Sequence, residues 1–127
     1  MAHPNEDVVR AYIAALGSGD MEGVRGHLAD DAVLHLGGRH AMAGDKQGAG
    51  EVVAALSAMA ERAGGAIRPE LHDLLSTEDH VVALVRRTIG GVDARAAVVY
   101  HVAEGKITEI WPHEASQYEL DEMMGSS

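Results

Sequence analysis

The spacing of apolar residues changes once along the chain, at Gly64 and Gly65. Before this pair most apolar residues recur every three or four positions, as in amphipathic helices; after it they form the short runs and alternations that are typical of strands. Helices first and strands second indicate an α+β fold rather than an alternating α/β one. A chain of 127 residues has room for one core. We therefore expect a single α+β domain over residues 1–127.

Three helices and one short strand are predicted ahead of the glycine pair. The helix over 49–62 has the clearest apolar stripe, and Asp20 is a suitable N-cap for a short second helix. The glycine-rich segment 37–48 shows no periodicity, so it is predicted to be a long loop that borders a binding site. The predicted elements are helices over 5–16, 21–28 and 49–62 and a strand over 32–36.

Four strands, joined as consecutive hairpins, are predicted after the glycine pair. They cover residues 66–75, 81–89, 92–103 and 106–111. Gly90 and Gly91 suit a primed two-residue turn, in which both residues take positive φ. We expect a curved antiparallel sheet that wraps the three helices, followed by one amphipathic turn within 117–124.

The strand segment 96–103 is apolar at both odd and even positions. An antiparallel strand with one wet face should alternate instead, so something must cover its second face. The helices of one small domain cover only one side of a sheet. The sequence therefore predicts a homodimer that forms through the outer sheet face.

Charge and composition exclude several classes of protein. The net charge of −10 would repel a phosphate backbone, so we expect no nucleic-acid partner. The absence of cysteine removes disulfides and thiolate metal sites. The first residues have neither a basic start nor an apolar core, so we expect no signal peptide, no membrane association and a cytoplasmic protein.

The chain has no Phe, one Trp and three Tyr, whereas it has six Met. Its core must be filled by aliphatic side chains and thioethers. A cavity in such a core would suit a small apolar or polyketide-like ligand better than a sugar or a nucleotide.

Four segments carry a resemblance to a known family: Val8–Leu16, Gly19-Asp20, Leu28–Ala32 and Gly105–Ile107. With the order of elements, they resemble the SnoaL-like branch of the NTF2-like superfamily, which includes ketosteroid isomerase. The resemblance implies an NTF2-like (cystatin-like) cone of three helices on a curved sheet, with a pocket between them and usually a dimer. Members include cofactor-independent isomerases, polyketide cyclases and epoxide hydrolases, together with binding proteins.

The family's catalytic residues transfer only in part. Tyr12 falls where ketosteroid isomerase has the tyrosine that hydrogen-bonds the enolate oxygen. The isomerase's general-base aspartate counts onto Leu36, and its second aspartate onto Val98 or Val99. Neither residue type can move a proton, so that arrangement is absent.

The other enzyme patterns of the family are also incomplete. The cyclase aspartate counts onto Pro112 or Ile110. The epoxide hydrolases use Asp, Arg and Asp, and here Arg86 is present but Thr88 stands where a carboxylate is needed. The usual family aspartates are therefore missing.

Histidine is the residue type that could replace them, because imidazole titrates near neutrality. His35 precedes the vacant base position; a strand bulge would turn it inward, whereas strict alternation would turn it outward. His113 neighbours the vacant cyclase position, with a rim or interface role as the alternative. The catalytic candidates are Tyr12, His35 and His113.

Seven further residues are candidate substrate contacts. Each also has a purely structural interpretation, as core filler, interface aromatic or solvent-exposed strand residue. No close-spaced ligand pair is present, so we expect no metal site. Four more histidines, in loop, helix-surface or terminal positions, are expected to be solvated: His3, His27, His40 and His80. The candidate substrate contacts are Leu36, Met42, Met59, His72, Arg86, Tyr100 and Trp111.

Three functions remain open. The first is a cofactor-independent enzyme that moves a proton next to a carbonyl, as an isomerase or cyclase, on an apolar metabolite. In it His35 or His113 is the base and Tyr12 stabilises the enolate oxygen. The second is a non-catalytic small-molecule binding protein of the same fold. The third is an epoxide hydrolase that uses Asp73 or Glu70 with Arg86.

Overall fold

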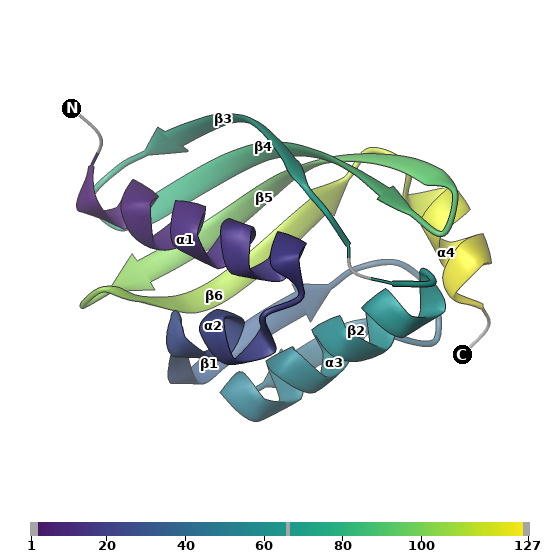
Figure 1. Ribbon diagram of the computed structural model, residues 1–127, viewed down its shortest axis with the longest axis horizontal. Helices are drawn as coiled ribbons and strands as arrows, with labels where there is room; N and C mark the ends of the chain where they lie inside the picture. Colours follow the sequence, from purple (N-terminus) through teal and green to yellow (C-terminus); the bar gives the residue numbers. More distant parts are fainter. Residues whose placement is uncertain (1–2, 66, 126–127) are drawn as a thin grey trace.

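The computed structural model describes residues 3–65 and 67–125 and shows one six-stranded sheet with helices packed on its concave face (Figure 1). The strand order is β2-β1-β6-β5-β4-β3. The predicted α+β class is therefore confirmed. The elements are α1 (Pro4–Ser18), α2 (Met21–Gly26), β1 (Leu28–Leu36), β2 (Gly44–Gln47), α3 (Ala49–Arg62), β3 (Glu70–Ser76), β4 (His80–Ile89), β5 (Val92–Ala103), β6 (Lys106–Glu114) and α4 (Gln117–Met124).

The first three helices follow their sequence signals. The Asp20 carboxylate accepts a hydrogen bond from the Gly23 N–H and caps α2. Helix α1 runs two residues beyond its predicted end and stops at Gly19, which takes the left-handed conformation with φ 75°. Helix α3 has the predicted bounds.

The hairpins β3–β4, β4–β5 and β5–β6 are antiparallel, as predicted. Gly90 and Gly91 have φ of 56° and 85°, as a primed turn requires. The strand predicted over 66–75 begins at residue 66, which lies outside the described residues; β3 itself begins at Glu70.

Two predictions about the sheet were wrong. It is not antiparallel throughout, because β1 pairs with β6 in parallel. Nor is segment 37–48 wholly a loop, because β2 pairs with β1 at the edge of the sheet. Strand β2 has the sequence GDKQ, and an exposed edge strand needs no apolar residues that would make it visible in the sequence.

Several elements are longer than predicted. Strand β1 begins at Leu28 instead of residue 32, and α2 accordingly ends at Gly26 instead of residue 28. Strand β6 continues through Pro112 to Glu114 instead of ending at Trp111. Its pairing with β1 ends at Ile110, so at Pro112 the strand has only β5 as a paired neighbour, and a proline is tolerated at such an edge. The tail forms a helix, α4, rather than a single turn.

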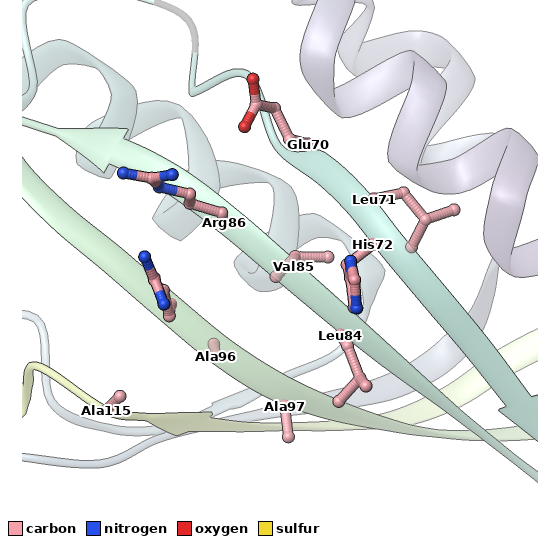
Figure 2. Close-up of a pocket in the computed structure, with 10 residues that line it drawn as sticks. Glu70, Leu71, His72, Leu84, Val85, Arg86, Ala96, Ala97 and Ala115 are labelled. Atoms are coloured by element: carbon pink, nitrogen blue, oxygen red, sulfur yellow. The ribbon is translucent and has the colours of Figure 1, made fainter.

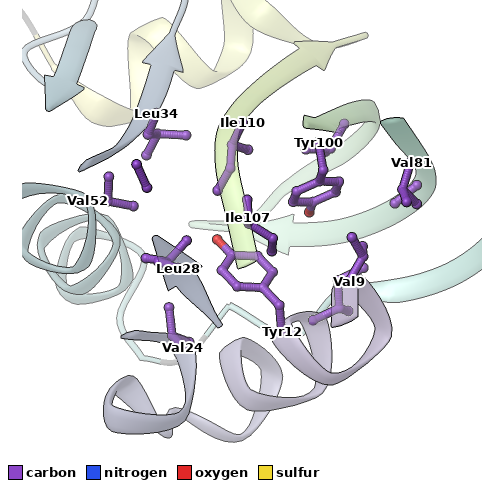
Figure 3. Packing of buried hydrophobic residues seen from close by; sticks show 14 of the residues in the cluster. Val9, Tyr12, Val24, Leu28, Leu34, Val52, Val81, Tyr100, Ile107 and Ile110 are labelled. Atoms are coloured by element: carbon purple, nitrogen blue, oxygen red, sulfur yellow. The ribbon is translucent and has the colours of Figure 1, made fainter. Parts of the chain in front are cut away.

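The main core lies between the concave sheet face and helices α1, α2 and α3 (Figure 3). Tyr12 of α1 meets Tyr100 of β5 edge to face, with ring centroids 5.7 Å apart. A second, smaller cluster lies under α4 and includes Ile89, Leu120 and Met124. The two clusters together contain all the buried hydrophobic residues of β4, β5 and β6.

Candidate functional site

A cavity of about 70 Å³ lies inside the cone, between α1, α3 and the inner face of the sheet. Most of its wall is aliphatic, with Leu34 and Leu36 from β1, Val98 from β5 and Ile110 from β6. Four polar side chains interrupt this wall: Tyr12, Arg87, Tyr100 and Glu114. The prediction of an aliphatic lining is confirmed.

Arg87 of β4 and Glu114 of β6 form an ion pair at the cavity wall. Each side chain is only 11% exposed. Among the described residues, Arg87 Nε is the single fully buried side-chain nitrogen or oxygen without a hydrogen-bond partner. A buried donor left unpaired costs about 1–3 kcal/mol, so an acceptor from outside the protein, whether a water molecule or a ligand, would stabilise this wall of the cavity.

The two tyrosines remain neutral in the cavity. Burial raises the pKa of the Tyr12 phenol well above its usual value. Burial, and then the neighbouring Tyr12, raise the pKa of Tyr100 in the same direction. Both side chains therefore keep their hydroxyl protons at every physiological pH and can donate hydrogen bonds.

A second hollow, of about 20 Å³, adjoins the cavity. It shares four wall residues with it and is closed by α4 and by the loop after β1. His40 lies in this wall and is 6% exposed, so the expectation that it is solvated was wrong. The shared residues are Leu36, Met59, Pro112 and Glu114.

His35 lies on the outer face of the sheet, as strict alternation predicted. The only bulge in the β1–β6 pairing falls before Val33, so Leu34 and Leu36 face inward and His35 faces outward. Its Nδ1 is 2.9 Å from Asp45 Oδ1 and its Nε2 is 2.9 Å from Glu109 Oε2. The ring also stacks on Trp111, with centroids 5.3 Å apart and an angle of 7° between the planes.

The surroundings of His35 act on its pKa in opposite directions. Burial lowers the pKa, but the hydrogen bonds with the Glu109 and Asp45 carboxylates outweigh burial and raise it above the usual value. His35 is therefore held as part of a surface ion-pair cluster and does not reach the cavity.

The other predicted polar contacts also lie on the outer face. His113 is opposite Ala97 of β5 and is exposed. His72 and Arg86 border a shallow groove of about 590 Å³ on this face (Figure 2). Arg86 donates two hydrogen bonds to Asp93, at 2.9 and 3.0 Å.

The epoxide-hydrolase arrangement therefore has no support inside the cone. Arg86 and Glu70 both line the outer groove. Asp73 is exposed and pairs with Leu84, another residue of that groove. None of the three lines the inner cavity.

Of the ten predicted site residues, the structure brings four together around the cavity: Tyr12, Leu36, Met59 and Tyr100. Met42 packs against the smaller core cluster instead. The remaining five lie on the outer face: His35, His72, Arg86, Trp111 and His113.

Sequence reasoning missed Arg87, Glu114 and His40. Arg87 carried a signal, because two consecutive arginines on a strand must point to opposite faces. Glu114 follows Ile110 and Pro112 at the inward-facing parity, but it lies beyond the predicted end of that strand at Trp111. His40 carried no signal, because its burial depends on packing between a loop and a distant helix.

In the part of the chain that the structure describes, no group of three or more His, Asp or Glu side chains is placed to hold a metal ion. No helix among these residues has the length and apolar character needed to cross a membrane.

Comparisons with known proteins agree with this architecture. A family model described as a SnoaL-like domain matches residues 9–110. The uncharacterised protein Rv0034 of Mycobacterium tuberculosis is 36% identical over 109 residues, which is 82% of this chain and 83% of that protein.

Two solved structures extend the comparison. Bal32a, from a soil-derived mobile gene cassette, has a TM-score of 0.89 at 28% identity, and the match covers 95% of this chain and 96% of Bal32a. TerC, co-crystallised with polyporic acid, has a TM-score of 0.84 at 18% identity, and the match covers 96% and 98% of the two chains. At that identity TerC shows a common fold alone.

Proposed function

The chain belongs to the SnoaL-like family and has its NTF2-like fold, and from this premise we propose that the inner cavity binds a small, largely apolar molecule carrying a carbonyl-type oxygen. The family supports a small-molecule function of the isomerase, cyclase or binding kind. The polar groups of the cavity determine which functional groups such a molecule needs in order to bind.

One observation carries the proposal: the buried, unpaired Nε–H of Arg87 in the cavity wall. A carbonyl, enol or carboxylate oxygen would satisfy this donor. The ion pair with Glu114 holds the guanidinium in place, so little side-chain entropy is lost when a ligand binds. The aliphatic wall would take the remainder of the molecule.

The cavity must widen to admit such a ligand. Sites for small molecules usually measure about 300–1,000 Å³, whereas this one measures about 70 Å³. Long, flexible side chains in the wall, Leu16 and Met59 among them, can move aside. That TerC was crystallised with polyporic acid supports a ligand role for this fold, though not that ligand for this chain.

The test separates the Nε donor from the charge of Arg87. Lysine at this position can still pair with Glu114 but lacks the Nε–H. We expect Arg87→Lys to bind 1-tetralone, a bicyclic aromatic ketone, at least about tenfold more weakly than the wild-type chain, as measured by calorimetry. Equal binding by the two chains would contradict the proposal, and so would an absence of ketone binding by the wild type.

Proton transfer is a second candidate function, and the position of Glu114 favours it. Its carboxylate lies in the same wall as the orphan donor. A carbon-bound hydrogen next to the ligand carbonyl would pass to Glu114 while the C–H electron pair moves onto the carbonyl oxygen, held by Arg87 Nε–H. Return of the proton at another carbon would complete an isomerisation. Glu114 takes the role expected of His35 or His113, both of which face outward.

Exchange with heavy water tests this second function. The wild-type chain should speed deuterium incorporation at the carbon next to the carbonyl of 1-tetralone, as followed by NMR. Glu114→Gln keeps a hydrogen-bond acceptor for Arg87 but cannot take up the proton, so exchange should return to the buffer rate. Exchange at the wild-type rate in this variant would exclude Glu114 as the base.

The outer sheet face is proposed to form a homodimer. Its centre carries half-buried apolar residues on three adjacent strands, Val82, Leu84, Val99 and Trp111 among them. A second copy of the same face would cover them with matching chemistry. Light scattering at micromolar concentration should give a dimer mass, and Val99→Asp a monomer; a monomeric wild-type chain would contradict the proposal.

A further inference from the structure

We infer that the cavity and the hollow beside it are two halves of one binding site, and that His40 is the polar contact of the second half. The inference rests on the proposed ligand-binding function and extends it. It assigns a role to His40 and gives the ligand a second polar group.

Two hydrogen bonds hold the loop that carries His40. The Arg39 N–H donates to Asp121 Oδ1 at 3.1 Å, and the Ala41 N–H donates to the Gly125 carbonyl at 2.9 Å. These bonds fix the residues on either side of His40 against α4 and its end. The imidazole is consequently buried, unlike the other seven histidines of the chain.

The hydrogen bonding of the ring fixes which nitrogen is available. The Met42 N–H donates to His40 Nδ1 at 3.0 Å. A nitrogen that accepts a hydrogen bond carries no proton, so in the neutral ring the proton is on Nε2. His40 therefore offers an N–H donor, as Arg87 does in the main cavity.

The wall between the two hollows is thin and adaptable. Four residues line both spaces, and one of them is Met59, an unbranched side chain with three rotatable bonds. A change in its rotamer would join the hollows. The other three shared residues, Leu36, Pro112 and Glu114, would then line the middle of a single elongated site.

The order of polar groups along this site defines the ligand class. Tyr12 and Tyr100 line the main cavity, Arg87 and Glu114 follow, and His40 lines the far hollow. A matching ligand has an apolar, preferably flat skeleton with one oxygen for Arg87 Nε–H and a second oxygen for His40 Nε2–H. Hydroxylated aromatic ketones have this form.

The experiment compares 1-tetralone with its 5-, 6- and 7-hydroxy derivatives by calorimetry. At least one hydroxy derivative should bind the wild-type chain about tenfold more tightly than the parent ketone. His40→Asn keeps an acceptor near the Nδ1 position for the Met42 N–H but has no group at Nε2, so in this variant the hydroxy derivative should bind no more tightly than the parent ketone. His40→Gln places an amide N–H near the Nε2 position and should restore most of the preference.

The outcomes separate this inference from the proposed function. If His40→Asn keeps the wild-type preference, or no hydroxy derivative is preferred, the role of His40 is overturned while ketone binding through Arg87 stands. If the parent ketone does not bind the wild-type chain, both fall. Met59→Ala should tighten binding of the preferred derivative, and unchanged affinity would show that the hollows do not join through Met59.

Discussion

Arg86 and Arg87 are neighbours in the chain but lie on opposite faces of the sheet, and each pairs with a carboxylate. The outer pair, Arg86–Asp93, has side chains that are 54% and 53% exposed. The inner pair, Arg87–Glu114, has side chains that are 11% exposed. Both are guanidinium–carboxylate pairs, but Arg86 donates through Nε and Nη2, whereas Arg87 donates through Nη2 alone. The inner pair is also far less exposed to solvent.

This difference in solvent exposure determines how strongly each ion pair affects stability and binding. Water screens the outer pair, so breaking it changes little. The inner pair has little contact with water, so each ion depends on the other, and the Arg87 Nε–H has no acceptor among the described residues. The outer face, with most of the histidines, is suited to contact another protein surface, whereas the inner face is suited to hold a small molecule.

The largest expected effect comes from removing one partner of the inner pair. Arg87→Met leaves the Glu114 carboxylate buried without its cation and should destabilise the fold by about 3–5 kcal/mol. Urea denaturation measures the loss. The double variant Arg87→Met with Glu114→Leu removes both charges and should recover most of it; a double variant as unstable as the single one would show that packing, not charge, is responsible.

The next effect compares two adjacent residues of β1 that point to opposite faces. Leu34 is 2% exposed in the core, and Leu34→Ala should cost roughly 3 kcal/mol of unfolding free energy. The matched change on the outer face, His35→Ala, should cost less than about 1 kcal/mol near neutral pH, since His35 belongs to a partly exposed ion-pair cluster. Equal losses in urea denaturation would contradict the assignment of the two faces.

A smaller effect is the pH dependence that His35 contributes. Its folded-state pKa lies above the ordinary value of 6.5, so its ionic contribution is complete below that pH and is lost as the pH rises through the folded-state pKa. The His side chain is 28% exposed and its partners are more so, which limits the contribution to less than about 1 kcal/mol.

His35→Asn provides the control for this titration. The difference in unfolding free energy between wild type and variant should shrink as the pH rises above 6.5. Trp111 is the only tryptophan and stacks on the ring, so its fluorescence should report the same transition in the wild type alone. A difference that grows with pH would show that the sign is wrong.

The smallest effect belongs to the outer arginine. Arg86→Met should leave the urea midpoint of the wild type within experimental error, at low salt as well as high salt, because both partners stay hydrated. A loss comparable to that of Arg87→Met would contradict the assignment of Arg86 and Asp93 to a hydrated part of the outer face, away from the apolar centre of the proposed dimer.

Much of the fold could be predicted from the sequence, because local signals determine it. The apolar stripe of 49–62 and the glycine turn at Gly90 and Gly91 act over a few residues and predicted the right elements. Strand β2 could not be found, because an exposed edge strand carries no apolar pattern. The parallel pairing of β1 and β6 joins distant segments and leaves no local trace.

The site was less predictable than the fold. Alternation says that Arg86 and Arg87 face opposite sides but not which side is inner, and that choice depends on the register of the whole sheet. The position of His35 depended on whether a bulge occurred beside it. His40 is buried only because α4 packs over its loop, a contact between residues about eighty positions apart.

The place of β6 within the sheet bears on how the chain is made. This strand lies between β1, made early in synthesis, and β5, made just before it. On the ribosome, the edge of β1 that pairs with β6 therefore stays unpaired until residues 106–114 have emerged. Productive folding of this domain is consequently a late event in translation, and the unpaired edge of β1 is where chaperones or misassociation between nascent chains would act.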